Sequence, residues 1–266
     1  MRGAFKRLVD RGHEVHVAYQ TSGNIALADD EAHRFANFVC DYNHHFNKES
    51  PQAIHLYRQV TDLLKNKKDS DMDTIEVRNI KGLIRKGEAR ATSCFEGLKD
   101  AQIHFMNLPS YETGTIEKKP VGEVDIQLTM DLTEKNKTPS NLCSRRFDRP
   151  TRDSQSMFGH HFKAVKRLKS KSFMDDCWRW LYRGEWQERA VDEIEMAVPM
   201  GPNQVLEKRY GIFKHQSQKN AVVFQKTDSR EFWQRLEDRN RETADFYDML
   251  GLARYAAMEA FVRWHY

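Results

Sequence analysis

The sequence has no paired cysteines and no long apolar run. Its four cysteines, Cys40, Cys94, Cys143 and Cys177, lie far apart and form no Cys-x-x-Cys pair. This spacing argues against a structural zinc site and against a disulfide scaffold, and it suits a reducing cytoplasm. The longest apolar runs are too short to cross a membrane, and no signal peptide is expected. We therefore expect a cytoplasmic protein that does not bind membranes.

A strong excess of one charge is also absent. Charged residues make up 31% of the 266 residues, yet the formal net charge is +4. No basic stripe carries interleaved aromatic residues, so nucleic acid is not an expected partner. An apolar fraction of 39% is low but compatible with a folded core. The length allows one large domain or two small ones, and no internal repeat is visible.

Helical and strand patterns alternate along the chain. Apolar residues at helical spacing predict helices at 1–12, 28–46, 51–65, 74–91, 121–136, 204–214, 229–250 and 252–264. Shorter apolar or alternating runs predict strands at 15–19, 101–109, 173–183 and 193–199. This alternation predicts a three-layer α/β fold with a mostly parallel sheet.

Two of these helices have candidate apolar faces. In the helix at 28–46 the face consists of Phe35, Phe38, Val39 and Tyr42. In the long helix, with Ser229 as its expected cap, the face consists of Phe232, Trp233, Leu236 and Phe246. His44 and His45 are adjacent, so on a helix they point in different directions and favour a solvated helix end over a shared metal.

A polar turn, Thr21–Asn24, follows the first predicted strand. Loops at the carboxyl ends of strands are where ligands bind in open α/β sheets. The turn is therefore a candidate substrate loop, although an ordinary connection between strand and helix explains it equally well. In the helix at 74–91, Arg85 and Glu88 are one turn apart and could pair with each other.

The stretch Lys137–Phe162 fits none of these patterns. It is rich in Arg, Ser, Thr and Asp, contains two prolines, and has neither helical nor strand periodicity. One interpretation is a mobile surface loop; another is that an active-site strand and loop belong here and have been lost. Permitted codons for Ser144–Gln155, read one nucleotide later, can encode Pro-His-Gly-Thr-His. We therefore predict one domain over 1–266 in which 137–162 is a frame-shifted segment without regular structure.

Several segments together resemble one family. They are GAFKRLVDRGHEVHVAYQTSGN, IRKGEARA, QIHFMNLPSYETGT, EIEMAVP, LEKRYGIFKHQSQK and SREFWQRLEDRNRETADFYDMLG. In combination they resemble the carboxyl-terminal half of bacterial glucosamine-6-phosphate deaminase-like proteins, a deacetylase-like domain of the LmbE/PIG-L type. The resemblance covers nearly the whole chain except 137–162. It implies a Rossmann-like fold and a role in amino-sugar metabolism.

The resemblance also implies how active members hold zinc. A His-Pro-Asp-Asp motif after the first strand and a later His-x-x-His loop supply the ligands, and one coordination position stays open for water. Here the first strand and its motif are expected to be missing before Met1, and the later segment reads DRPTRDSQ without histidine. The neighbouring His160 and His161 are adjacent rather than three apart. We therefore expect no catalytic residue, metal ligand or cofactor in this chain.

Other family positions can be matched. Arg85 and Glu88 fall on an Arg-x-x-Glu pattern whose Arg resembles a residue that faces the substrate, and 215–218 matches a His-x-Ser-Gln pattern near the site. The resemblance thus implies a remnant site for an amino sugar or sugar phosphate, formed by Asn24, Arg85, His215 and Gln218. Without the family, Arg85 would be an exposed ion pair of little energetic value, and His215 would cap a helix end.

Three functions remain open on the sequence. The chain could be an inactive relative of the sugar deacetylases, or a working zinc-dependent N-acetyl-sugar deacetylase that recruits metal through His13, His16 or His215. It could also be a binding module that keeps the sugar pocket or docks a deaminase partner. We further expect low intrinsic stability, because the loss of a central strand would leave unpaired strand edges.

Overall fold

The computed structural model describes residues 2–48, 50–68, 71–115, 117–137, 140–144, 159–182, 190–218 and 230–265. The helices are α1 (Arg2–Asp10), α2 (Asp29–His45), α3 (Pro51–Asn66), α4 (Ile75–Phe95), α5 (Glu123–Asn136), α7 (Gly159–Leu168), α8 (Pro202–Phe213) and α9 (Phe232–Met249). The strands are β1 (Val17–Tyr19), β2 (Ile103–Phe105), β3 (Ser140–Ser144), β4 (Trp178–Tyr182), β5 (Met196–Met200) and β6 (Ala257–Arg263). This mixture confirms the predicted α/β class.

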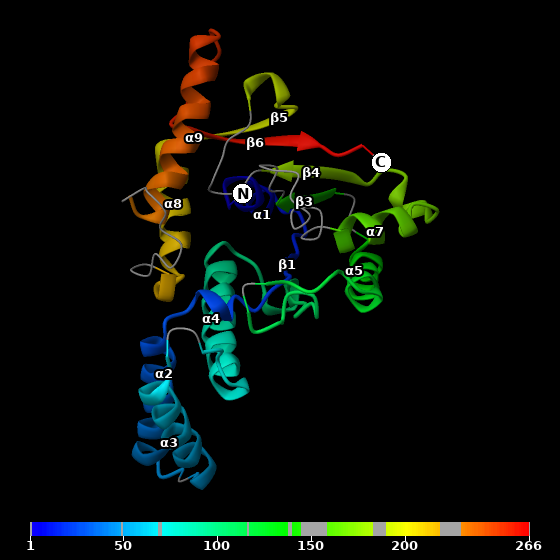
Figure 1. Cartoon of the computed structure of the whole chain (residues 1–266). Helices are drawn as coiled ribbons and strands as arrows, with labels where there is room; N and C mark the ends of the chain where they lie inside the picture. Colours follow the sequence, from blue (N-terminus) through cyan, green and yellow to red (C-terminus); the bar gives the residue numbers. More distant parts are fainter. Residues whose placement is uncertain are drawn as a thin grey trace.

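The described strands form two sheets (Figure 1). In the smaller sheet β1 pairs with β2 in parallel, and Ala18 lies opposite His104. In the larger sheet the order is β3-β4-β6-β5. There β3 and β4 are parallel, whereas β6 runs antiparallel to both of its neighbours. No pairing among the described strands joins the two sheets.

Local sequence signals set several helix ends as predicted. The Ser50 hydroxyl accepts a hydrogen bond from the Ala53 N–H at 3.2 Å, and Pro51 takes the first position of α3. Gly12 follows α1 with φ at +79°, a left-handed conformation that glycine adopts without strain. These caps confirm that α1 and α3 begin or end where the sequence indicated.

The helix predicted at 252–264 is wrong, because this segment contains strand β6. Its sequence AMEAFVR contains Ala, Met and Glu, residues that favour a helix locally. β5 pairs with the first five residues of β6, and β4 pairs with its last three on the other side. Its first five residues are buried, so tertiary pairing outweighs local propensity here.

The apolar face predicted for α2 does not face the core. Phe35 and Phe38 are 38% and 61% exposed, whereas the small residues Ala32 and Ala36 are buried. These two alanines pack with Val60 of α3 and with α4. Small side chains allow the three helices to approach closely, so the larger ones remain outside.

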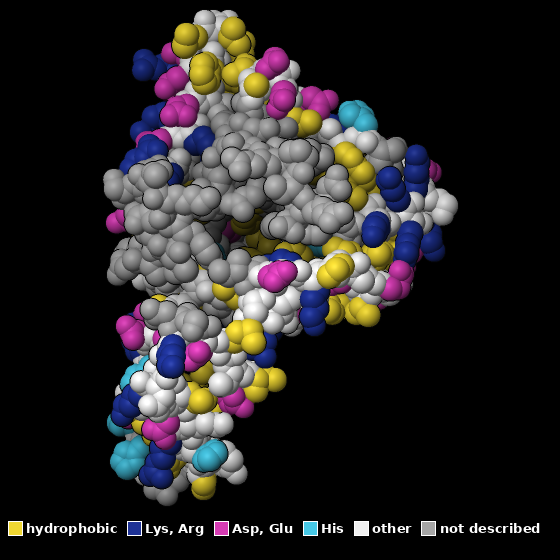
Figure 2. Space-filling view, viewed as in Figure 1, with side chains coloured by type: hydrophobic (Ala, Val, Ile, Leu, Met, Phe, Trp, Pro, Cys, Tyr) yellow, Lys and Arg dark blue, Asp and Glu magenta, His cyan; other side chains and the backbone are white. Residues whose placement is uncertain are grey.

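The apolar face predicted for α9 is wrong for a different reason. Phe246 is 53% exposed, and the space-filling view shows apolar side chains gathered at the free end of α9, at the top of the molecule (Figure 2). The buried face of α9 is largely polar because α8 supplies partners to Glu237 and Asn240. The expected cap Ser229 lies outside the described residues, and α9 begins after Glu231, whose N–H donates to Gln234 Oε1 at 2.8 Å.

The expectation that 137–162 forms no regular structure is wrong at both ends of the stretch. Ser140–Ser144 forms β3, which pairs in parallel with β4, and α7 begins at Gly159. Backbone pairing with β4 holds a strand here although its sequence has no alternating pattern. Residues 145–158 lie outside the described residues, and the frame-shift hypothesis stays a prediction.

The core consists of several small clusters rather than one. One lies among α2, α3 and α4, a second joins Phe5 of α1 to Leu98 and Ile103 beside the smaller sheet, and a third includes Val165 and Leu168 of α7. This division fits the low apolar content of the chain. Among the described residues, no helix is long and apolar enough to span a bilayer.

Candidate functional site

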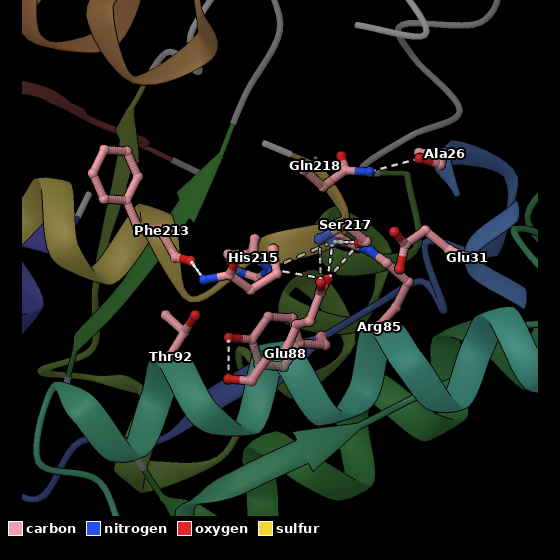
Figure 3. Close-up of polar contacts among 12 residues, drawn as sticks. Ala26, Glu31, Arg85, Glu88, Thr92, Phe213, His215, Ser217 and Gln218 are labelled. Carbon is pink, nitrogen blue, oxygen red and sulfur yellow. Dashed lines mark hydrogen bonds and ion pairs between the residues drawn. The ribbon is translucent and has the colours of Figure 1, made fainter. Parts of the chain in front are cut away.

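The candidate site lies where helix α4 meets the turn η5 (Gln216–Gln218), which follows α8 (Figure 3). From α4, Arg85 Nη1 donates to Glu88 Oε2 at 2.6 Å, as the spacing of these residues predicts. From η5, the Ser217 N–H donates to Glu88 Oε1 at 2.6 Å and the Ser217 hydroxyl donates to Oε2 at 2.8 Å. Glu88 of α4 therefore forms hydrogen bonds to Ser217 of η5, a residue 129 positions away in the sequence.

His215 lies beside this pair at the end of α8. Its Nδ1 is 3.5 Å from Arg85 Nη1 and 3.9 Å from Glu88 Oε2. The His215 backbone N–H donates to the Ile212 carbonyl at 3.0 Å, which continues the α8 hydrogen bonds into the turn. His215 thus lies just past Lys214, the C-cap residue of α8, and its side chain lies beside the Arg85–Glu88 pair.

Gln218 connects η5 to the turn after β1. Its side-chain Nε2 donates to the carbonyl of Ala26 at 2.6 Å, in the short 3-10 turn η1 (Asn24–Ala26). Asn24, the first residue of η1, is buried. The four residues predicted for a remnant site, from three separate segments, therefore lie around one junction at the carboxyl end of β1. That this junction binds a substrate stays a prediction.

Gly23 permits the approach of Arg85 to this turn. It adopts φ of +69°, and a Cβ at this position would lie 3.1 Å from Arg85 Nε. Both the positive φ and the short distance to Arg85 disfavour any residue with a side chain at position 23. Arg85 Nε is buried and has no hydrogen-bond partner among the described residues. The guanidinium thus retains a buried donor that faces the turn.

The sequence did not predict the role of Glu112. Its Oε1 accepts a hydrogen bond from the Ser22 N–H at 2.7 Å and so holds the turn after β1. Glu112 follows β2 in the YETGT turn. Since β1 and β2 are adjacent parallel strands, their carboxyl ends lie at the same edge of the sheet, and this adjacency could have indicated the contact.

Electrostatics keep Glu88 ionised. Burial raises the pKa of Glu88, but the neighbouring His215, the hydrogen bonds from Ser217 and the charge of Arg85 outweigh burial and lower the pKa below its usual value. Both carboxylate oxygens already accept hydrogen bonds from protein donors. Glu88 is therefore suited to position Arg85 and Ser217, and poorly suited to accept a proton from a substrate.

The described residues contain no group of three or more His, Cys, Asp or Glu side chains that could hold a metal ion. His16 instead lies against His104 of β2, with 3.0 Å between Nδ1 and Nε2. The adjacent His160 and His161 are buried in α7, and burial lowers their pKa values to about 4 and about 3. The absence of a metal site from the whole chain stays a prediction.

No family model matches the chain. Over 267 residues it is 44% identical to the "Putative glucosamine-6-phosphate deaminase-like protein" of Bacteroides thetaiotaomicron. The match covers 99% of the chain but 40% of the relative, so the chain spans less than half the length of that protein.

Two solved structures have a similar fold. GalB, the 4-carboxy-2-hydroxymuconate hydratase from Pseudomonas putida, has a TM-score of 0.56 at 10% identity and covers 100% of this chain and 90% of its own. N,N'-diacetylchitobiose deacetylase from Pyrococcus horikoshii has a TM-score of 0.55 at 16% identity and covers 99% and 78%. The chain is thus similar, over almost its whole length, to part of a glucosamine-6-phosphate deaminase-like protein, and its α/β fold is similar to the folds of this hydratase and this deacetylase.

Proposed function

We propose that the chain binds an amino sugar, or its phosphate, at the junction of Asn24, Arg85, His215 and Gln218 without zinc-dependent hydrolysis. The observation that carries the proposal is that η5 forms hydrogen bonds to two other segments, α4 and η1. Ser217 binds Glu88 of α4, and Gln218 binds the Ala26 carbonyl of η1. These contacts hold polar side chains from three segments around the carboxyl end of a parallel strand, the edge at which α/β folds bind ligands.

The names of two similar proteins support this ligand class. The relative from Bacteroides thetaiotaomicron is named for glucosamine-6-phosphate, and the structure from Pyrococcus horikoshii is that of a diacetylchitobiose deacetylase. Both names refer to amino sugars. We propose the same ligand class here, in the cytoplasm, with a deaminase domain as a partner of the binding module.

Binding without hydrolysis is supported by the chemistry of the junction. Arg85 supplies a guanidinium, and guanidinium N–H groups donate to sugar hydroxyls and phosphate oxygens. Glu88, the carboxylate nearest to Arg85 in this network, already accepts three hydrogen bonds. It therefore positions other groups and does not act as the general base of a hydrolysis.

The test compares two glycine substitutions that impose the same backbone strain. Gly23→Ala places a methyl group beside Arg85 Nε, whereas Gly12→Ala, at a φ of +79°, meets nothing within 4 Å. Each should cost about 1 kcal/mol of stability. By calorimetry with glucosamine 6-phosphate and N-acetylglucosamine, wild type and Gly12→Ala should bind one of them, and Gly23→Ala should bind it at least about tenfold more weakly. No binding by wild type, or equal binding by both variants, would refute the proposal.

A zinc-dependent N-acetyl-sugar deacetylase is the second candidate, supported by the likeness to the diacetylchitobiose deacetylase. The metal content of purified protein and the release of acetate from N-acetylglucosamine derivatives distinguish it from the first. We expect neither stoichiometric zinc nor acetate release. Tightly bound zinc together with acetate release would establish the deacetylase instead.

A further inference from the structure

Helix α4 carries three basic residues, Arg78, Lys81 and Arg85, whose spacing places them on one face of the helix. Two of them have carboxylate partners. Lys81 Nζ donates to two aspartates, at 2.6 and 2.8 Å, and Arg85 donates to a glutamate at 2.6 Å. Arg78 differs, because it forms no ion pair with the described residues and its Nε is buried without a hydrogen bond. This face of α4 therefore holds one guanidinium without a counter-charge.

Arg78 lies against the turn that follows β2. Its guanidinium contacts Gly114, which adopts a φ of +75°. A Cβ at this position would collide with Arg78 Nη1 and would lie 3.1 Å from Cζ, so glycine is needed for this approach. Two helical turns further along α4, Arg85 makes the same kind of contact with Gly23 in the turn after β1. Each of the two turns thus has one arginine of α4 against a left-handed glycine.

A hydrogen bond connects the two turns. The Ser22 N–H, beside Gly23, donates at 2.7 Å to Oε1 of Glu112, which lies in the turn that Arg78 contacts. Because β1 and β2 are adjacent and parallel, both turns lie at the same edge of the smaller sheet. Arg78 and Arg85 therefore both lie along this edge. Their separation of seven helical residues places their Cα atoms about 10 Å apart.

The other charges of this turn do not neutralise Arg78. Glu112 accepts the hydrogen bond from Ser22, and it also lies close enough to Lys118 to interact with its charge. Glu112 and Lys118 thus offset each other, and the positive charge of Arg78 is left over. A half-buried guanidinium without a counter-charge favours an anionic ligand over a neutral one.

We infer that Arg78 binds the phosphate group of an amino-sugar phosphate whose sugar ring lies at the candidate site beside Arg85. The inference rests on the proposed function and deepens it, because it selects the phosphorylated ligand over the free amino sugar. A guanidinium forms paired, charge-assisted hydrogen bonds with phosphate oxygens. The spacing of about 10 Å between the two arginines along α4 is comparable with the length of a hexose phosphate.

The first test measures the preference for phosphate by calorimetry with glucosamine 6-phosphate and glucosamine. Wild type should bind the phosphorylated ligand at least about tenfold more tightly, because it gains hydrogen bonds between charged groups. Arg78→Gln should lower the ratio of the two dissociation constants at least about tenfold. The control is Arg90→Gln on the same helix, which removes an exposed guanidinium paired with the exposed Asp100 and should keep the wild-type ratio.

The outcomes separate this inference from the proposed function. Equal binding of the two ligands by wild type, binding of N-acetylglucosamine alone, or a wild-type ratio in Arg78→Gln would each overturn the inference. In these cases the proposed amino-sugar site would still stand. Binding of no amino sugar and no amino-sugar phosphate would refute the proposed function, and the inference with it.

A second test keeps Arg78 in the chain and displaces its guanidinium. Gly114→Ala places a methyl group against Arg78, whereas Gly251→Ala, at a φ of +82°, meets nothing within 4 Å and imposes similar backbone strain. Gly114→Ala should weaken the binding of glucosamine 6-phosphate at least about tenfold, and Gly251→Ala should not. Equal effects of the two variants would mean that strain alone weakens binding and would contradict the role of Arg78.

Inorganic phosphate distinguishes a sugar phosphate from a free anion. It should bind wild type at least about tenfold more weakly than glucosamine 6-phosphate, because it lacks the sugar that contacts the rest of the site. Equal affinity for the two would assign Arg78 to free phosphate and would overturn the inference.

Discussion

Glu88 connects the parts of the candidate site at the scale of single residues. It accepts hydrogen bonds from Arg85 on its own helix and from the backbone and side chain of Ser217. A largely buried carboxylate such as that of Glu88 is stable when such donors replace water. Because the carboxylate has a charged partner and two further donors, the junction between α4 and η5 depends on its ionised form.

This dependence predicts a pH effect. The pKa of Glu88 in the folded protein lies below its usual value of 4.5, so the unfolded state binds the proton more readily. The stabilisation is therefore fully present above pH 4.5 and is lost as the pH falls through the folded pKa. Chemical denaturation of wild type and Glu88→Gln should give a stability difference that is large at pH 7 and shrinks below pH 4.5. Glu207→Gln, which removes an exposed carboxylate, is the control; a constant difference between wild type and Glu88→Gln would contradict the expectation.

The sequence predicted the pairing within α4 but not all of the junction. The pair of Arg85 and Glu88 follows from helix geometry, since residues three apart share a face. His215 and Gln218 were chosen through the family resemblance, because nothing local shows that 215–218 lies over α4. The contact of Gly23 with Arg85 also could not be predicted, since it depends on how β1 and α4 pack.

At the scale of elements, β6 shows how a buried ion pair can define a strand. Glu259 lies in the middle of β6, and both it and Lys208 of α8 are buried. Glu259 also accepts hydrogen bonds from the backbone N–H groups of Gly3 and Ala4 at the start of α1. A local pattern cannot reveal these partners, which lie far away in the sequence. The local pattern therefore predicted the wrong element for 252–264, although it predicted α3 and α4 well.

Removing one member of this pair should be costly. Burial raises the pKa of Glu259, but nearby positive charges, of which Lys208 has the largest effect, outweigh burial and lower the pKa far below its usual value. Glu259→Gln leaves Lys208 buried without its counter-charge and should reduce the free energy of unfolding by about 3–5 kcal/mol. The control is Asp10→Asn, which breaks the exposed Lys6–Asp10 pair on α1 and should cost less than about 1 kcal/mol. Equal losses in denaturant titrations would contradict the assigned role of the buried pair.

At the scale of the whole molecule, two small sheets are joined by helices. Helix α1 contacts α8 and β5, and its Phe5 also packs with Leu98 and Ile103 beside the smaller sheet. Helix α4 contacts α8, where the Thr92 hydroxyl donates to the Gly211 carbonyl at 3.3 Å. No pairing among the described strands joins the sheets. The α/β class was predictable from the alternation of patterns, but this division was not, because strand pairing depends on contacts distant in sequence.

This architecture predicts that the protein unfolds in more than one step. A sheet of two strands is marginal by itself, so β1 and β2 depend on α1 and α4 for their attachment to the larger sheet. Backbone amides of β1 and β2 should therefore exchange with solvent faster than those of β4 and β6, and thermal unfolding should show two transitions. Thr92→Val, which removes the hydrogen bond to Gly211, should lower the first transition and leave the second in place. Thr133→Val removes a similar bond to Thr129 within α5 and should not separate the transitions further. A single cooperative transition, with equal protection of backbone amides from exchange in both sheets, would contradict this prediction. The helices would then couple the two sheets more strongly than the contacts of α1 and α4 indicate.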